Sequence, residues 1–201
     1  MLNYNQLLEE ELQQIKKNNK TPNLLLHSCC APCSSYVISY LTNYFNITIL
    51  YYNPNISPIE EYEKRKQEQI KLINELKTTN RLNIIDCDYD NDIYEQTIKG
   101  LENELEGGKR CHKCFQLRLE KTAQIAKENN YDYFSTTLTV SPYKNATILN
   151  EIGINIQDKY NIKWLYSNFK KKDGYKKSIE LSKKYNLYRQ NYCGCKYSKH
   201  L

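Results

Sequence analysis

The length, composition and charge of the chain restrict the classes of protein to which it can belong. It has 201 residues, of which 40% are hydrophobic, and a chain of this size buries about 70% of its unfolded surface in one core. No run approaches the roughly 20 apolar residues of a membrane span, and the start of the chain lacks the basic and apolar regions of a signal peptide. We therefore expect a single domain over residues 1–201, located in the cytoplasm.

The net charge of +6 is unevenly distributed. Residues 1–108 hold 10 basic and 16 acidic side chains, whereas residues 109–201 hold 19 basic and 7 acidic ones. A strongly basic half is typical of proteins that bind a polyanion such as a nucleic acid, although solvated helix faces give the same pattern. Charge alone leaves both interpretations open.

The first third of the chain alternates between helical and strand-like patterns. Apolar side chains recur at helical spacing before Pro22, and the run Leu24-Leu25-Leu26 then suits a buried parallel strand that leads into a cysteine-rich turn. Pro32 in that turn favours the start of a helix, and Ser57 has capping-box spacing to Glu60. The patterns predict, in order, a helix over residues 1–19, a strand over 23–28, a helix from Pro32, a strand over 47–52 and a helix from Ser57.

The alternation continues to the end of the chain. Gly107-Gly108 separates two helical patterns, and a basic helix precedes the C-terminal tail. The remaining expected elements are a strand over 82–85, helices over 92–105 and 112–129, a strand over 133–138, a helix over 141–160, a strand over 163–166 and a helix over 175–185. Such alternation predicts an α/β fold: an open, mostly parallel sheet with helices on both faces, whose ligand site lies at the carboxyl ends of the strands.

Eight cysteines in a protein of the reducing cytoplasm indicate metal binding or redox chemistry rather than structural disulfides. Cys29, Cys30 and Cys33 follow the first expected strand. Cys111 and Cys114 form a Cys-x-x-Cys at the start of a helix, whose free N–H groups and dipole favour thiolates. Structural zinc is the alternative to an iron–sulfur cluster, although adjacent cysteines rarely direct both sulfurs to one small ion. Spacing alone leaves zinc open.

The tail carries a different pattern, Cys193-Gly194-Cys195. A disulfide across this spacing needs the bent backbone that glycine permits and would be strained, and strained disulfides are easily reduced. The pair therefore suits a two-electron relay better than a structural link. Two other residues are expected to be bystanders: Cys87, alone after the third strand, and His27, packed in the first strand with a local hydrogen bond.

Seven motifs spread over the chain are specific when taken together. They are LHSCCAPCS (26–34), YYNPNI (51–56), EYEKR (61–65), GGKRC (107–111), RLEKTA (118–123), STTL (135–138) and NYCGC (191–195). On these motifs the sequence resembles the QueH family of cobalamin-independent epoxyqueuosine reductases nearly from end to end. The resemblance implies a fold like the Rossmann-like (HUP-like) domain of ATP-pyrophosphatase tRNA-modifying enzymes, with the cysteine turn in place of the phosphate loop.

The resemblance also implies a cofactor and a reaction. It implies a [4Fe-4S] cluster on Cys29, Cys30, Cys111 and Cys114, an adjacent iron ion with Cys33 as its candidate neighbour, and a redox-active pair at Cys193 and Cys195. The implied enzyme is an oxidoreductase that acts on tRNA. It would reduce epoxyqueuosine at the wobble position to queuosine, the last step of queuosine biosynthesis, with electrons from an unidentified donor.

The basic half would then hold the tRNA through its phosphates. The candidate residues are Lys109, Arg110, Lys113, Lys170, Lys171, Lys172, Lys176 and Lys177. Two other functions are weighed against the reductase. One is a zinc-stabilised RNA-binding protein without catalysis. The other is a cluster-dependent tRNA thiolase, which the missing Ser-Gly-Gly phosphate loop disfavours.

Overall fold

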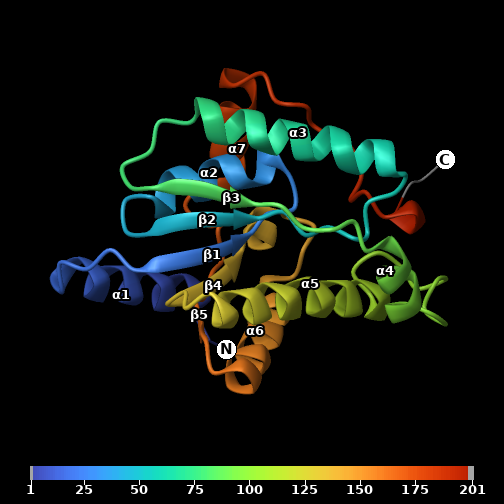
Figure 1. Ribbon diagram of the computed structural model, residues 1–201, viewed down its shortest axis with the longest axis horizontal. Coiled ribbons are helices and arrows are strands. Elements are labelled where there is room, and N and C mark those ends of the chain that lie inside the picture. Colours follow the sequence, from blue (N-terminus) through green and yellow to red (C-terminus); the bar gives the residue numbers. More distant parts are fainter. Residues whose placement is uncertain (1, 199–201) are drawn as a thin grey trace.

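The computed structural model describes residues 2–198, and this part of the chain forms a five-stranded, entirely parallel sheet (Figure 1). Its strands are β1 (Asn23–His27), β2 (Asn46–Leu50), β3 (Leu82–Ile85), β4 (Tyr133–Thr136) and β5 (Lys163–Trp164). The spatial order is β3-β2-β1-β4-β5, so the direction of the strand order changes between β1 and β4. In sheets of this kind ligands bind beyond the carboxyl ends of the strands at that change of direction.

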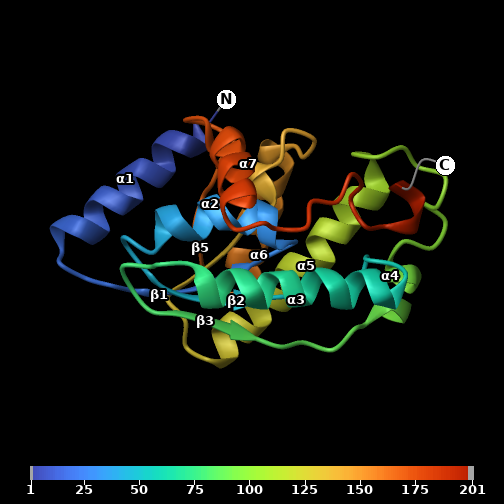
Figure 2. The same cartoon turned by 90° about the horizontal axis from the view of Figure 1, so that it is seen from above.

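Helices cover both faces of the sheet. They are α1 (Tyr4–Lys17), α2 (Ala31–Leu41), α3 (Ile59–Glu75), α4 (Asn91–Thr97), α5 (Lys109–Glu128), α6 (Ala146–Tyr160) and α7 (Gly174–Lys184). Because successive strand residues point to opposite faces, Leu24 and Leu26 pack against α1, α2 and α3, whereas Leu25 packs against α5 and α6. Figure 2 shows α7 beside α2 and the C-terminal segment running from α7 toward α4. The expected α/β fold is confirmed.

Four helices begin or end at other residues than the sequence predicts, and a side-chain cap explains one of these differences. The helix expected from Ser141 begins at Ala146, because Asn145 Oδ1 accepts hydrogen bonds from the backbone N–H groups of the first turn. The helix expected to reach residue 105 ends at Thr97, and Gly100 follows with φ of +82°. Ser57 does not cap α3, whose N-cap is Pro58 without a side-chain bond. α5 begins at Lys109, three residues earlier than expected.

His27 lies inside the sheet, as the sequence predicts. Its side chain is fully buried, with Nδ1 2.9 Å from Thr136 Oγ1 and Nε2 3.0 Å from the carbonyl oxygen of Tyr52. These two contacts connect β1 with β4 and with the segment that follows β2. Among residues 2–198, no helix has the length and apolar character that crossing a membrane requires.

Candidate metal and redox site

Three cysteines converge where β1 ends and α2 begins. The Sγ atoms of Cys29, Cys30 and Cys33 all lie within 4.8 Å of one another, and those of Cys29 and Cys30 are 3.8 Å apart. Cys30 is the extended N-cap residue of α2, so its neighbours lie on either side of a helix start. A group of three thiols at this spacing is a potential metal site, although the sequence had assigned Cys33 only a neighbouring role.

A buried polar network fixes the shape of this turn. Ser28 Oγ and Ser34 Oγ both donate to Gln69 Oε1 of α3, at 2.6 and 2.9 Å. Asn53 Nδ2 donates to the carbonyl oxygen of Ser28 at 2.8 Å. Each of these four side chains is at most 1% exposed. The thiols therefore project from a backbone that is held from both sides, which preorganises them for a metal.

The three thiols differ in acidity because they share hydrogen bonds. Bonds from Cys30, and then from Cys33, hold the pKa of Cys29 well below its usual value. The bond between Cys29 and Cys30 raises the pKa of Cys30 to about 12, and the bond between Cys29 and Cys33 raises the pKa of Cys33. Cys29 is thus the member of the group that becomes a thiolate first, which is the form that binds metals.

Cys111 and Cys114 lie in the first two turns of α5, outside that group of three thiols. Cys111 is half-buried, and its Sγ accepts a hydrogen bond from the backbone N–H of Gly107 at 3.2 Å. Cys114 is 6% exposed and packs with Cys195, and burial raises the pKa of Cys114 to about 12. Each of these two thiols therefore lies near one cysteine of the tail, Cys111 near Cys193 and Cys114 near Cys195.

A cavity of about 420 Å³ connects the cysteine turn with the tail. Cys29, Cys33 and Cys193 all line it, at the carboxyl ends of the strands. Its volume falls within the roughly 300–1,000 Å³ of small-molecule sites. Cys193 also lines a second, smaller cavity together with Cys111. One thiol of the tail pair is therefore positioned next to both cysteine groups.

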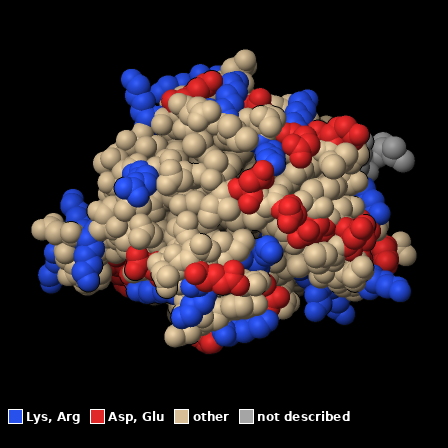
Figure 3. Space-filling model, viewed as in Figure 1, with Lys and Arg blue, Asp and Glu red and all other residues tan. Residues whose placement is uncertain are grey.

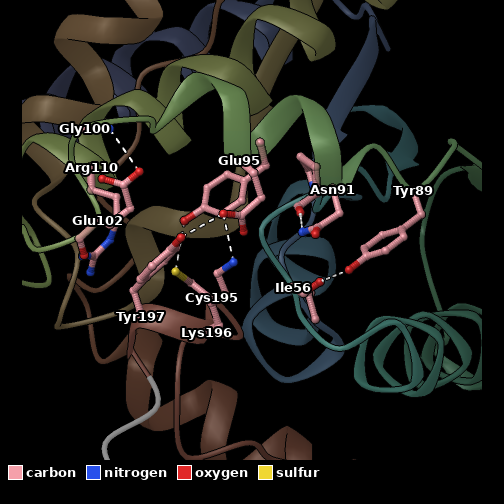
Figure 4. Close-up of polar contacts among 12 residues, drawn as sticks. Ile56, Tyr89, Asn91, Glu95, Gly100, Glu102, Arg110, Cys195, Lys196 and Tyr197 are labelled. Carbon is pink, nitrogen blue, oxygen red and sulfur yellow. Dashed lines mark hydrogen bonds and ion pairs between the residues drawn. The ribbon is translucent and has the colours of Figure 1, made fainter.

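The two tail cysteines, both free thiols here, have different surroundings. Cys193 is half-buried and faces the cavity, whereas Cys195 is 7% exposed with its Sγ 3.0 Å from the hydroxyl oxygen of Tyr94 on α4. Figure 4 shows the contacts that hold this end of the chain on α4. Glu95 binds the Lys196 ammonium group at 3.0 Å and accepts a hydrogen bond from the Tyr197 hydroxyl at 2.8 Å.

Gly194, between the two cysteines, has no room for a side chain. Its φ is +104°, and a Cβ atom would lie 2.8 Å from Arg65 Nη1 and 2.9 Å from Ile56 Cγ1. We expect Gly194→Ala to destabilise the chain by about 1–3 kcal/mol and to displace the pair. Gly107→Ala is the matched control, because Gly107 also has a positive φ, +89°, but open space at its Cβ. Equal losses in thermal unfolding for the two variants would contradict the steric argument.

Two buried arginines flank the thiols; both belong to the family motifs, although the sequence alone indicates no role for them. Arg65 and Arg118 are 2% and 1% exposed, line the cavity, and each has one Nη2 atom that is buried without a partner. Arg65 Nη1 donates to the carbonyl oxygen of Cys193 at 3.1 Å. Burial acts to lower the pKa of Arg118, but the nearby thiols, Cys114 first, raise it and prevail. The spacing of four between Cys114 and Arg118, one helical turn, was the available signal.

These unpaired donors provide a test of whether the site suits an anionic metal group. A buried guanidinium nitrogen without an acceptor is unfavourable, and sulfur atoms bonded to a metal are acceptors that carry negative charge. Lys144 also lines both cavities and has no carboxylate partner among the described ion pairs. Burial acts to lower its pKa, but the thiols, Cys193 first, raise it and prevail. The donor set therefore fits a thiolate-bound metal centre.

The basic residues expected to bind tRNA do not all lie on the surface. Arg110 is 2% exposed, and its Nη1 donates to the carbonyl oxygens of Glu102, at 2.7 Å, and Glu104. This corrects its expected role: it fastens the segment before α5 instead of facing solvent. Lys172 forms an ion pair with Glu9 at 2.8 Å, and Lys170 Nζ donates to the Lys144 carbonyl oxygen. The exposed candidates are Lys109, Lys113, Lys171, Lys172, Lys176 and Lys177.

Surface charge is segregated. On the face shown in Figure 3, acidic side chains gather over the side where α4 lies, and Lys and Arg lie mostly around the edges. The acidic side corresponds to the segment 86–106, which carries eight of the acidic residues of the chain. A polyanion would therefore approach from another direction.

Comparison with known proteins shows the family of the chain. Residues 24–200 match the family described as "Epoxyqueuosine reductase QueH". Proteins of that name from Streptococcus pyogenes and Staphylococcus epidermidis are 42% and 44% identical, over 98% and 96% of this chain and 78% and 83% of theirs. A solved structure, a predicted subunit of tRNA methyltransferase from Methanocaldococcus jannaschii, has a TM-score of 0.48 and 14% identity over 80% of this chain and 76% of its own. The chain therefore belongs to the QueH family of epoxyqueuosine reductases.

Proposed function

We propose that this chain is a cytoplasmic, single-domain enzyme that reduces epoxyqueuosine to queuosine at the wobble position of tRNA. The observation that carries the proposal is the shared cavity: Cys29 of the metal-binding turn and Cys193 of the tail pair line the same space. Substrate in that cavity would contact a metal centre and a thiol reductant at once. The family name supports the reaction, because the relatives are named for it.

A [4Fe-4S] cluster bound by Cys29, Cys30, Cys111 and Cys114 is the cofactor we propose, with an adjacent iron beside Cys33. Such a cluster supplies single-electron transfer, and an open iron site supplies Lewis acidity. The protein's part is to hold it. The turn network of Gln69 fixes two of the thiols, and the Gly107 N–H group donates to Cys111. Arg65 and Arg118, which line the cavity and have unpaired nitrogens, would supply hydrogen-bond donors for its sulfur atoms.

The tail pair provides the electron and proton balance. Removing the epoxide oxygen as water to leave a double bond takes two electrons and two protons. Oxidation of the Cys193 and Cys195 thiols to one disulfide releases two electrons and two protons, so one dithiol balances one epoxide. The external donor, still unidentified, would reduce the disulfide afterwards. Cys193 faces the cavity, and Cys195 lies near Cys114. This placement suits a pair that passes electrons between the substrate in the cavity and the proposed cluster.

The proposed function is tested with protein purified under anaerobic conditions. Iron, sulfide and zinc are measured together with the absorption spectrum before and after dithionite, and the protein is then given tRNA that contains epoxyqueuosine. We expect about four irons and four sulfides per chain, a broad band that bleaches, and conversion of the base to queuosine by nucleoside mass spectrometry. One zinc per chain, no colour and no conversion would leave an RNA-binding protein instead.

Phosphate contacts by the basic half make the affinity for tRNA depend on salt. We propose Lys109, Lys113, Lys170, Lys171, Lys172, Lys176 and Lys177 as contributors. Removing two exposed lysines in Lys176→Ala/Lys177→Ala should make the negative slope of log affinity against log salt shallower by about 2, equally for every tRNA tested. Lys16→Ala/Lys17→Ala, at the end of α1, is the control with the same charge loss. A flat salt response of the unaltered protein would exclude a phosphate-binding surface.

A further inference from the structure

Two side-chain carbonyl oxygens in the wall of the cavity have no hydrogen-bond partner. Asn55, in the segment that follows β2, is 1% exposed, and its Oδ1 is buried and unpaired. Gln190, in the tail before the cysteine pair, is half-buried, and its Oε1 is also buried and unpaired. Buried acceptors are nearly always paired in folded proteins. Because both residues line the same cavity, one ligand there could pair with both.

The metal group does not meet this need. Sulfide and thiolate sulfurs accept hydrogen bonds, so they match the unpaired nitrogens of Arg65 and Arg118 and not the carbonyl oxygens. The oxygens of Asn55 and Gln190 need N–H or O–H groups. The polar edge of a purine-type base carries such donors, and amide side chains are common readers of base edges. The cavity therefore has two kinds of unpaired wall groups, for two different ligands.

An aromatic ring stands at the edge of the cavity. Tyr143 is 80% exposed and lines both cavities next to Lys144. Its backbone N–H donates to Ser141 Oγ at 3.3 Å, and Asn145 caps α6, so the segment that carries the ring is anchored on both sides. An exposed aromatic ring beside a cation is the arrangement on which splayed RNA bases stack.

We propose that the modified wobble base leaves the stack of the anticodon loop and enters this cavity. There the side-chain carbonyls of Asn55 and Gln190 accept its hydrogen bonds, and Tyr143 stacks at the entrance. This inference rests on the proposed function and adds the residues that select the base. Phosphate contacts are common to all tRNAs and position the substrate, whereas these three side chains read the base itself.

Binding measurements separate the two roles without requiring turnover. Affinities are measured for one tRNA in two forms, with epoxyqueuosine and as the unmodified transcript, for the metal-loaded protein and its variants. Asn55→Leu and Gln190→Ala should each reduce the preference for the modified form by about tenfold, the usual effect of losing one buried hydrogen bond. Lys176→Ala/Lys177→Ala should weaken both forms equally. Tyr143→Ala should weaken binding of the modified form, and Tyr143→Phe should retain it.

Each outcome decides between the proposals. If the unaltered protein prefers the modified tRNA and both Asn55→Leu and Gln190→Ala keep that preference, base reading by these residues is wrong and the proposed function stands. If the unaltered protein shows no preference, base reading is wrong, and the conversion of epoxyqueuosine in tRNA tests the proposed function separately. Melting temperature and metal content are measured for every variant. Loss of metal in Asn55→Leu would show that Asn55 supports the metal centre and would overturn its role as a reader of the base. Gln190→Ala, at a half-buried position in the tail, tests base reading independently.

Discussion

Replacing Cys193 or Cys195 by serine is expected to lower turnover by roughly 1,000-fold or more, as the loss of an essential reacting group does in other enzymes, while the metal content and absorption spectrum stay unchanged. Serine keeps the size of the side chain but cannot form the disulfide that balances epoxide reduction. The measurement is queuosine formed per enzyme under multiple turnover, alongside iron and sulfide analysis of the same samples.

The surroundings of the two cysteines make the paired experiment informative. Cys193 faces the cavity and Cys195 lies against Tyr94, so a redox role for the pair predicts the same loss from either variant despite these different environments. Cys87→Ser is the matched control: Cys87 is half-buried, lies outside the group of three thiols, and burial raises its pKa to about 11. If Cys193→Ser or Cys195→Ser lost iron, the residue would be a metal ligand, and the relay would be excluded.

The sequence predicts the fold well where apolar periodicity alone decides the structure. Apolar runs predict all five strands and their alternation with helices. Leu24-Leu25-Leu26 is an example, because its residues pack against both faces of the sheet. The boundaries of α4 and α6 could not be predicted in the same way. The start of α6 depends on the bonds of Asn145 to its first turn, and the end of α4 is followed by the left-handed backbone of Gly100, neither of which apolar patterns encode.

The sequence likewise predicts only the part of the site that local spacing determines. Local spacing places Cys29, Cys30 and Cys33 on one turn, and a pattern search finds them readily. The groups that surround the thiols come from distant segments: Gln69 and Arg65 from α3, Arg118 from α5 and Lys144 from the segment before α6. Their burial depends on the tertiary structure. From sequence alone, a charged residue on a helix is expected to be exposed to solvent. Arg110 shows the same effect, because it is expected at the surface but is buried and binds loop carbonyl oxygens.

The second large effect is expected at the turn. Cys29→Ser should reduce bound iron to less than about a tenth of the unaltered level and abolish turnover with it, because a hydroxyl group is a far poorer ligand for iron than the thiolate that Cys30 and Cys33 stabilise on Cys29. The turn itself should persist, since Gln69 and Asn53 hold its backbone and neighbouring hydroxyls without using Cys29 Sγ. Iron analysis and thermal unfolding of metal-free samples measure the two effects separately, with Cys87→Ser as the control.

Cys33→Ser distinguishes the two roles that remain for the third thiol. The Sγ atom of Cys33 lies close enough to that of Cys29 for both to bind the same metal. The proposed cluster ligands do not include Cys33, which would instead lie beside an additional iron. If Cys33 serves only that additional iron, Cys33→Ser keeps the visible absorption band and loses at most about one iron per chain. Loss of the band would make Cys33 a ligand of the cluster itself, and one of the cysteines on α5 would then be free. Full iron content and full activity in Cys29→Ser would contradict the metal site at this turn altogether.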